Sequence, residues 1–141
     1  MGVKSSEITL KCHKIIGGYG EGEALVSHEP ICFYLTDPKT GVVREQSHEL
    51  AGKNIANKVL VFPSGKASSV VQIDGLFKLA SHNVAPKALI VKDVETVLVV
   101  SAFLVNVPLV DRLEKDPLEI IRSGDFVKVD AEKCRVTITR K

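Results

Sequence analysis

Aromatic side chains and excess charge are both scarce in this chain, which narrows the range of ligands that it is built to bind. Tryptophan is missing, aromatic residues make up 5% of the 141 positions, and the net charge is +2, from 19 basic and 17 acidic residues. Proteins that bind nucleic acids generally present a basic face, or aromatic rings on which bases stack. The basic residues here are scattered along the chain, so the composition argues against a nucleic-acid-binding protein.

Cysteine is also rare, and the three cysteines do not form a recognisable pattern. Cys12, Cys32 and Cys134 are odd in number, widely spaced and without a C-x-x-C pair. This argues against a disulfide framework, and against a zinc or iron–sulfur site built from this chain alone. The first seven residues lack the apolar core of a signal peptide, and the apolar stretch 96–110 is shorter than the ~20 residues that span a bilayer. We therefore expect a cytoplasmic protein without a membrane segment.

The apolar residues that are present predict a β-rich chain with β–α alternation in its middle. The expected strands are 8–12 running towards 16, 24–26, 31–35, 58–62, 88–91 and 108–110, and a closing hairpin of 126–129 and 134–139. The glycine cluster 17–22 is interpreted as a turn, and helical spacing predicts a helix of about three turns from 70 to 81–83. A helical turn is expected at 117–121, whereas 94–105 suits a strand or a buried helix equally. The predicted class is a mixed α/β fold, with one domain over 1–141.

The most informative segment is the loop between the predicted strand 58–62 and the predicted helix, which reads PSGKASSVV over 63–71. It places Lys66 and three serines at a helix start, where unpaired backbone N–H groups favour negative charge. One interpretation is structural, because Ser69 and Gln72 have the spacing of a capping box. The other is a hydroxyl held beside an anionic substrate. The loop alone does not decide between them.

Several familiar catalytic motifs do not fit this loop. A Walker A motif would need glycine where Leu60 stands, and Ser or Thr where Ala67 stands. A nucleophile elbow fails as well, because neither Ser64 nor Ser68 lies in G-x-S-x-G. The four histidines lack a distinctive context, so we interpret each of them as a surface or packing residue.

The loop and several other short motifs, in the same order, resemble the aconitase X swivel-domain family. The motifs are EGEALV at 21–26, EPICFY at 29–34, DPKTG at 37–41, HELAG at 48–52, PSGKASSVV at 63–71 and SGD at 123–125. The resemblance covers nearly the whole chain. It implies a swivelling β/β/α fold, with a barrel-like sheet and flanking helices.

The resemblance also implies a function, that of the small subunit of a heteromeric hydro-lyase. Such a subunit acts with an aconitase X-type large subunit, which holds an iron–sulfur cluster and most of the substrate contacts, while this chain binds no cofactor. The implied substrate is a small phosphorylated hydroxy acid, mevalonate 5-phosphate. The implied proton acceptor is Ser68, and Ser64, Gly65, Lys66 and Ser69 shape the loop or contact substrate. Ala67 stands where the family pattern has glycine, a departure that crowds the backbone turn.

Three other functions remain open at this point. A dehydratase of the same family could act on another small hydroxy acid, such as a hydroxyproline, and substrate profiling would separate the two. A swivelling phosphohistidine carrier would need a histidine shortly after a glycine-rich turn, and His28 lies too far from Gly17 and Gly18. A non-catalytic interaction module would have no iron–sulfur partner.

Overall fold

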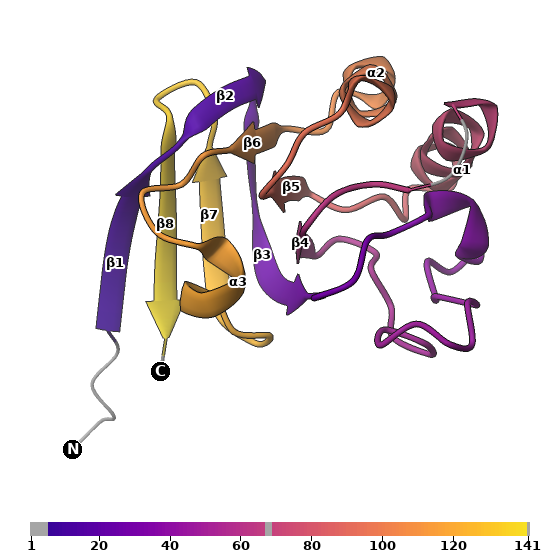
Figure 1. Ribbon diagram of the computed structural model, residues 1–141, viewed down its shortest axis with the longest axis horizontal. Coiled ribbons are helices and arrows are strands. Elements are labelled where there is room, and N and C mark those ends of the chain that lie inside the picture. The colour runs from indigo at the N-terminus through magenta and orange to yellow at the C-terminus, as the bar shows by residue number, and fades with distance from the viewer. Residues whose placement is uncertain (1–5, 67–68, 141) are drawn as a thin grey trace.

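The computed structural model describes residues 6–66 and 69–140, with Ser69 and Val70 described by their backbone alone. Within these residues, eight strands and four helices follow one another (Figure 1). The strands are β1 (Ser6–Lys11), β2 (His13–Ile16), β3 (Tyr19–Val26), β4 (Val59–Phe62), β5 (Ala88–Val91), β6 (Leu109–Asp111), β7 (Phe126–Asp130) and β8 (Arg135–Arg140). The helices are the 3₁₀ helix η1 (Phe33–Leu35) and the α-helices α1 (Ser69–Ser81), α2 (Thr96–Val105) and α3 (Pro117–Ile120).

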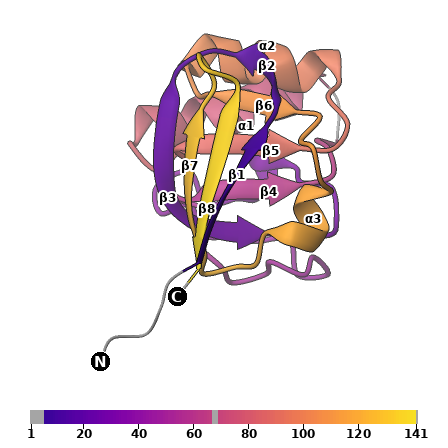
Figure 2. The same cartoon turned by 90° about the vertical axis from the view of Figure 1, so that its left-hand side faces the viewer.

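All eight strands belong to one curled sheet in the order β1-β8-β7-β3-β4-β5-β6-β2. The strands β3, β4, β5 and β6 are parallel to one another, and the remaining pairings are antiparallel. β1 and β2 are separated by Cys12 alone, yet they occupy opposite ends of the strand order. The sheet must therefore bend back towards itself, which gives the half-barrel in Figures 1 and 2. This confirms the predicted mixed α/β fold with a barrel-like sheet.

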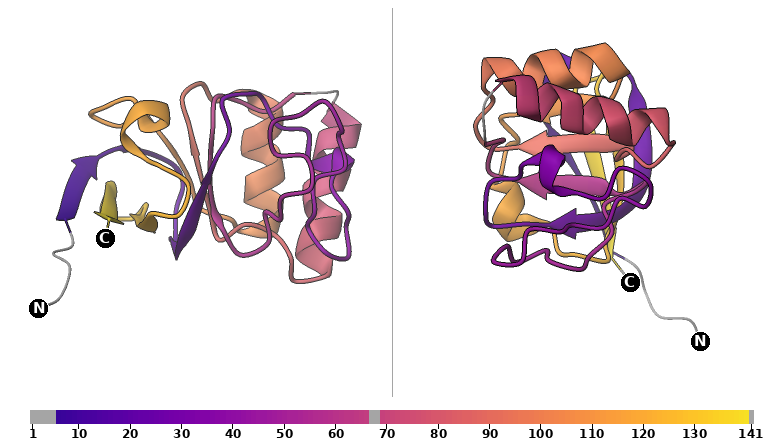
Figure 3. Two further views of the ribbon diagram at one scale, coloured as in Figure 1. Left: turned by 90° about the horizontal axis from the view of Figure 1, so that it is seen from below. Right: turned by 90° about the vertical axis from the view of Figure 1, so that its right-hand side faces the viewer.

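The central strands are apolar on both sides because each of their faces is covered. On β4, Leu60 and Phe62 face the core beneath the helices, whereas Val59 and Val61 face the core inside the curl. Side chains alternate across a strand, so a strand covered on both faces reads as a continuous apolar run. Figure 3 shows α1 and α2 side by side over the outer face of the sheet. The opposite core lies within the curl and is joined by Leu118 of α3.

The glycine cluster is not a turn, because β3 begins at Tyr19 and includes two of its glycines. A Cβ on Gly20 would collide with the carbonyl oxygen of Lys87, and one on Gly22 would lie 2.8 Å from that of Asn57. The backbone of β3 therefore passes close to the segments that lead into β5 and β4. Glycine allows this approach inside a strand, and the prediction of a turn over 17–22 was wrong beyond its first residues.

The predicted strand 31–35 is also wrong, because this segment forms one β-bridge at Ile31 and then the helix η1. The side-chain amide of Gln72, in α1, accepts a hydrogen bond from the Phe33 amide at 2.9 Å and donates one to the Ile31 carbonyl at 3.1 Å. These backbone groups are thereby paired with a helix instead of a strand. Residue type alone favoured a strand, and a contact distant in sequence overrode it.

The undecided segment 94–105 is a helix, α2, whose two ends are well capped. The Glu95 carboxylate accepts hydrogen bonds from the amides of Val97 and Leu98 at 2.8 and 2.9 Å. Asn106 ends the helix in a left-handed conformation with φ of 57°. These caps decide between strand and helix where side-chain composition did not. Over the described parts of the chain, none of the helices is long and apolar enough to cross a membrane.

We predict that Gly75→Ala destabilises the protein, although alanine is the better helix former by about 1 kcal/mol. The new Cβ would collide with the Tyr34 amide and lie 2.6 Å from the Phe33 carbonyl carbon, so η1 would have to move away from α1. We expect the free energy of unfolding to fall by about 1–3 kcal/mol in urea titrations. Ser81→Ala, at an exposed position of the same helix, should change it by less than about 0.5 kcal/mol. A Gly75→Ala protein as stable as wild type would contradict this constraint.

Candidate active site

The carboxyl ends of the parallel strands meet at one edge of the sheet, on the side where α3 lies (Figure 2). The residues that follow these strands are Ser27 and His28 after β3, Pro63 and Ser64 after β4, Lys92 and Asp93 after β5, and Arg112 after β6. Ligands of open α/β sheets bind outside the carboxyl ends of the strands. The serine loop therefore begins at the edge where a ligand site is expected.

The first part of the serine loop is held by backbone hydrogen bonds on two sides. Ile31 donates to the Ser64 carbonyl and Lys66 donates to the Ile31 carbonyl, both at 3.1 Å. On the other side, Asp93 donates to the carbonyl of Pro63 at 3.0 Å. The loop is thus anchored before it reaches the start of α1 at Ser69. Ala67 and Ser68 lie outside the described residues.

Gly65 fits into a narrow space between the starts of the two long helices. A Cβ at this position would lie 2.7 Å from Nε2 of Gln72 and 3.1 Å from Oε1 of Glu95. Gln72 is buried, with 1% of its surface exposed, and both ends of its amide bond to residues 31 and 33. The Gln72 side chain is thus bonded to η1 and to the residue two positions before it, and the Ser69 side chain lies outside the described part of the chain, so the capping box stays a prediction.

Lys66 forms an ion pair with a carboxylate that sequence reasoning had missed. Its Nζ donates to Oε2 of Glu45 at 2.6 Å, and the Glu45 side chain is 20% exposed. This contact ties the serine loop to the irregular segment between η1 and β4. The predicted contacts of Ser64, Gly65, Lys66 and Ser69 with substrate stay predictions.

A second cluster of polar residues at the same edge is centred on Glu49. Its carboxylate accepts hydrogen bonds from the backbone amide of His28 and from the Ser27 hydroxyl at 3.3 Å. The His28 ring lies 3.4 Å from the other carboxylate oxygen. Burial tends to raise the pKa of Glu49, but the hydrogen bonds from His28 outweigh it and hold the pKa below its usual value. His28 is exposed, which agrees with its interpretation as a surface or packing residue. Its hydrogen bonds with Glu49 were not predicted, and its position two residues after the predicted strand 24–26 was the signal available in the sequence.

Lys92 and Asp116 continue this polar edge beyond β5. Lys92 Nζ lies 3.1 Å from Oδ2 of Asp116, whose other oxygen accepts from the Leu118 amide at 3.0 Å at the start of α3. Burial opposes the ionisation of Asp116, but the amide of Leu118, the ammonium of Lys92 and the nearby His28 lower its pKa. Two carboxylates, a lysine and an imidazole therefore lie together beside the serine loop.

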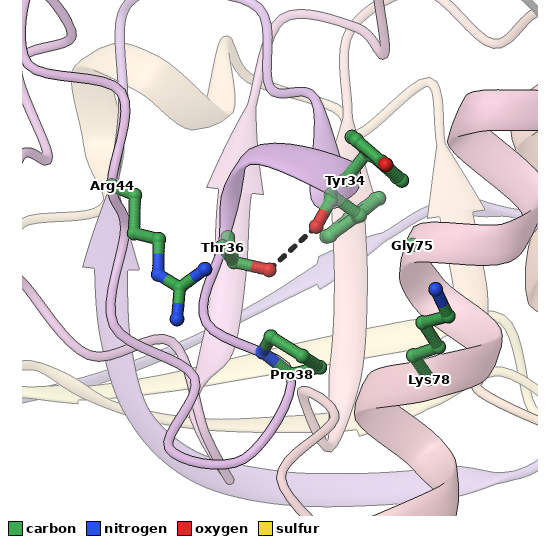
Figure 4. Close-up of a pocket in the computed structure, with 7 residues that line it drawn as sticks. Tyr34, Thr36, Pro38, Arg44, Gly75 and Lys78 are labelled. Carbon is green, nitrogen blue, oxygen red and sulfur yellow. Dashed lines mark hydrogen bonds between the residues drawn. The ribbon is translucent and has the colours of Figure 1, made fainter.

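A pocket of about 240 Å³ lies between η1 and α1 (Figure 4). Tyr34, Arg44 and Lys78 surround its mouth, and the Lys78 ammonium lies 5.9 Å from the centre of the Tyr34 ring. Both cations are already paired, Arg44 with Asp37 at 2.9 Å and Lys78 with Asp74 at 3.0 Å. This pairing leaves the pocket with little net charge to attract an anion.

The cysteines do not converge on a common site. The Cys12 amide donates to the Cys134 carbonyl at 3.0 Å at the end of β1 and β8, whereas Cys32 is buried beside η1. Burial and the neighbouring Cys134 raise the pKa of the Cys12 thiol to about 11. Among residues 6–66 and 69–140, no group of three His, Cys, Asp or Glu side chains is placed to hold a metal ion. These residues do not fit an iron–sulfur cluster, and its predicted location on a partner stays a prediction.

Known proteins are similar to this chain over almost its entire length. The family model of the aconitase X swivel domain matches residues 9–138. The phosphomevalonate dehydratase small subunit of Methanosarcina mazei is 42% identical over 135 residues, which cover 95% of this chain and 93% of that protein. The protein of the same name from Methanosarcina acetivorans is 45% identical over 134 residues, 94% of this chain and 92% of that protein.

Two solved structures share the fold. The crystal structure of Thermococcus kodakaraensis aconitase X in its holo form matches with a TM-score of 0.85 at 39% identity, covering 93% of this chain and 98% of that chain. The solution NMR structure of a UPF0107 protein matches with a TM-score of 0.80 at 39% identity, covering 92% and 97% of the two chains.

We predict that Glu49→Gln lowers stability at neutral pH but not in acid. The folded-state pKa of Glu49 lies below its unfolded value, so its contribution is present above the unfolded pKa and is lost as the pH falls through the folded pKa. For a partly exposed carboxylate we expect roughly 0.5–1 kcal/mol at pH 7. Urea unfolding of wild type and variant at pH 7 and near pH 3 measures the difference. Glu23→Gln, at an exposed position of β3, is the control, and an equal loss at both pH values would refute the assignment.

Proposed function

The chain belongs to the aconitase X swivel-domain family, and we propose that it is the small subunit of a heteromeric hydro-lyase that dehydrates mevalonate 5-phosphate. The product is trans-anhydromevalonate 5-phosphate, an intermediate in isoprenoid precursor synthesis by an archaeal-type mevalonate pathway. The observation that supports this best is the similarity to phosphomevalonate dehydratase small subunits over almost the full length of both chains.

The reaction removes a proton from the carbon next to the carboxylate and a hydroxyl group from the neighbouring carbon. The electrons of the C–H bond form the double bond, and the hydroxyl leaves and becomes water on taking up a proton. We propose that Ser68 accepts the first proton. A serine oxygen becomes a base at neutral pH only where its negative charge is stabilised by nearby donors.

The start of α1 supports this role for a serine in the loop. The first backbone N–H groups of a helix have no partner within it, and they favour a negative charge by about 1 kcal/mol, up to about 2 where partly buried. α1 is 13 residues long and begins at Ser69, directly after the proposed base. Lys66 is paired with Glu45, so we assign it the role of fixing the loop between β4 and α1.

We propose that an aconitase X-type large subunit completes the site. The name "small subunit" of the relatives implies a larger partner, and the exposed edge formed by the carboxyl ends of β3 to β6 supports an open half-site on this chain. The iron–sulfur cluster belongs on that partner in this proposal. We place the complex in the cytoplasm, because the three cysteines are free thiols, as a reducing compartment maintains them.

We predict that Ser68→Ala lowers turnover by orders of magnitude while folding and assembly remain normal. Loss of a general base typically lowers kcat by 10²–10⁴-fold. Steady-state assays of the reconstituted complex measure the rate, and size-exclusion chromatography checks assembly. Ser81→Ala, at the far end of α1, is the matched control and should keep wild-type turnover. Retained turnover in Ser68→Ala would remove this residue from the mechanism.

We also predict that the chain is inactive alone and gains activity with its partner. Co-expression with the large subunit should give a stable complex that contains iron and sulfide and forms the dehydrated product, detected by mass spectrometry. Dehydratase activity in the isolated chain, free of iron and of a second polypeptide, would rule out the half-site proposal. Turnover of a hydroxyproline in preference to mevalonate 5-phosphate would reassign the substrate within the family.

A further inference from the structure

A pocket of about 180 Å³ lies at the carboxyl ends of β5 and β6, where three basic side chains gather. We call it the basic pocket and define it by Lys92, Arg112, Lys115 and Asp116, which line it together with apolar side chains that include Val91. Lys92 follows β5, and the other three come from the segment between β6 and α3.

The charges of the basic pocket do not cancel. Lys92 is paired with Asp116 at 3.1 Å, and within the parts of the chain that the structure describes, Arg112 and Lys115 form no ion pair. Two of the three positive charges are thus left without a carboxylate. Unlike the pocket beside η1, whose Arg44 and Lys78 are both paired, this one has an excess of positive charge at its mouth.

The segment that carries Arg112 is fixed to the rest of the fold. Asp111 lies 2.8 Å from the His13 ring. The Glu114 amide donates a hydrogen bond to the Lys11 carbonyl at 3.1 Å, and the Lys11 amide donates one to the Glu114 carboxylate at 2.5 Å. Arg112 itself has a φ of 51°, a left-handed conformation that residues other than glycine rarely adopt. The surrounding contacts therefore hold Arg112 in one backbone conformation at the strand ends.

The basic pocket lies at the end of the strand next to the one that leads into the serine loop. β5 lies directly beside β4 in the sheet, and Asp93 donates to the carbonyl of Pro63, the residue that opens the loop. Adjacent strands are about 4.8 Å apart, so the space between the ends of β5 and β6 is offset from the end of β4 by roughly 5–10 Å. An offset of this order is within the length of a small extended molecule that reaches from the serine loop with its anionic end in the basic pocket.

We propose that the basic pocket binds the phosphoryl group of the substrate, with Arg112 as the principal contact. This inference rests on the proposed function, which supplies a substrate with a phosphoryl group at the end remote from its carboxylate. A guanidinium binds two phosphate oxygens at once, whereas an ammonium acts as a point charge. Lys115 adds charge, and Asp116 holds Lys92 at the entrance.

The test uses the reconstituted complex with Arg112→Ala. A phosphoryl contact remote from the reacting carbon is made in the ground state and the transition state alike, so its loss raises KM and leaves kcat nearly unchanged. We expect KM to rise about 10–100-fold, the range for one charge-assisted hydrogen bond. Competitive inhibition by inorganic phosphate should weaken in parallel. Arg135→Ala, which removes the same charge from an exposed position on β8, should leave both constants unchanged.

A second measurement separates the failure of this inference from failure of the proposed function. The isolated ¹⁵N-labelled chain is titrated with inorganic phosphate, since a relative at 39% identity has been solved by NMR in solution. Shifts of the amides of 92 and 112–116, lost in Arg112→Ala and kept in Arg135→Ala, support the pocket even if the complex shows no dehydratase activity. Unchanged KM in an active Arg112→Ala complex overturns the inference, and any phosphate shifts then indicate an adventitious ion only. If the complex is inactive, absence of these shifts overturns it.

Discussion

Burial of β4 and β5 on both faces is the constraint on which the other parts of the structure depend. The two strands form a wall between the core under α1 and α2 and the core inside the curl, and all eight of their residues are buried. A strand in this position cannot shift its register by one residue without exchanging its contacts with both cores. The loops that leave the carboxyl ends of these strands therefore start from fixed points. This explains how short, polar segments are held in place at an exposed edge.

Polar side chains that bind backbone groups also hold these loops in place. Gln72 binds residues 31 and 33, and Glu95 caps α2. Glu49 accepts hydrogen bonds from the Ser27 hydroxyl and the His28 amide. These side chains pair backbone groups that regular structure leaves unpaired, in the loops and at the start of α2. The edge is thus rigid on the side of this chain. That rigidity fits a half-site whose other half is a separate polypeptide, because a fixed loop loses little entropy on assembly.

The elements that sequence predicted correctly are those whose own residues determine them. β4 and β5 are unbroken apolar runs, α1 has apolar residues at helical spacing, and Pro117 and Gly124 bracket the helical turn. The errors arose where distant partners decide. Residues 31–35 look like a strand but bind Gln72, and the glycines of β3 serve a close approach to backbone from elsewhere in the chain.

The features of the candidate site also divide into those that neighbours in sequence determine and those that distant contacts determine. The position of the serine loop between a strand and a helix followed from its neighbours in sequence. The role of Ser68, which lies outside the described residues, is a proposal that comes from the family motifs. The pairing of Lys66 with Glu45, and of His28 with Glu49, joins residues 21 positions apart across segments with little regular structure. The sequence did not indicate Arg112 either, because its place beside Lys92 depends on β5 and β6 being neighbours in the sheet.

The pairing of β1 with β8 has a consequence for how the chain acquires its structure during synthesis. Ser6 lies opposite Arg140, so β1 cannot pair until β8, more than a hundred residues later in the chain, has been synthesised. The β4–α1–β5 unit is local and can form earlier, whereas the curl closes late, after a loop of more than a hundred residues has been brought together. Until then the apolar inner face of the sheet is uncovered, and a nascent chain in this condition is a natural client for chaperones.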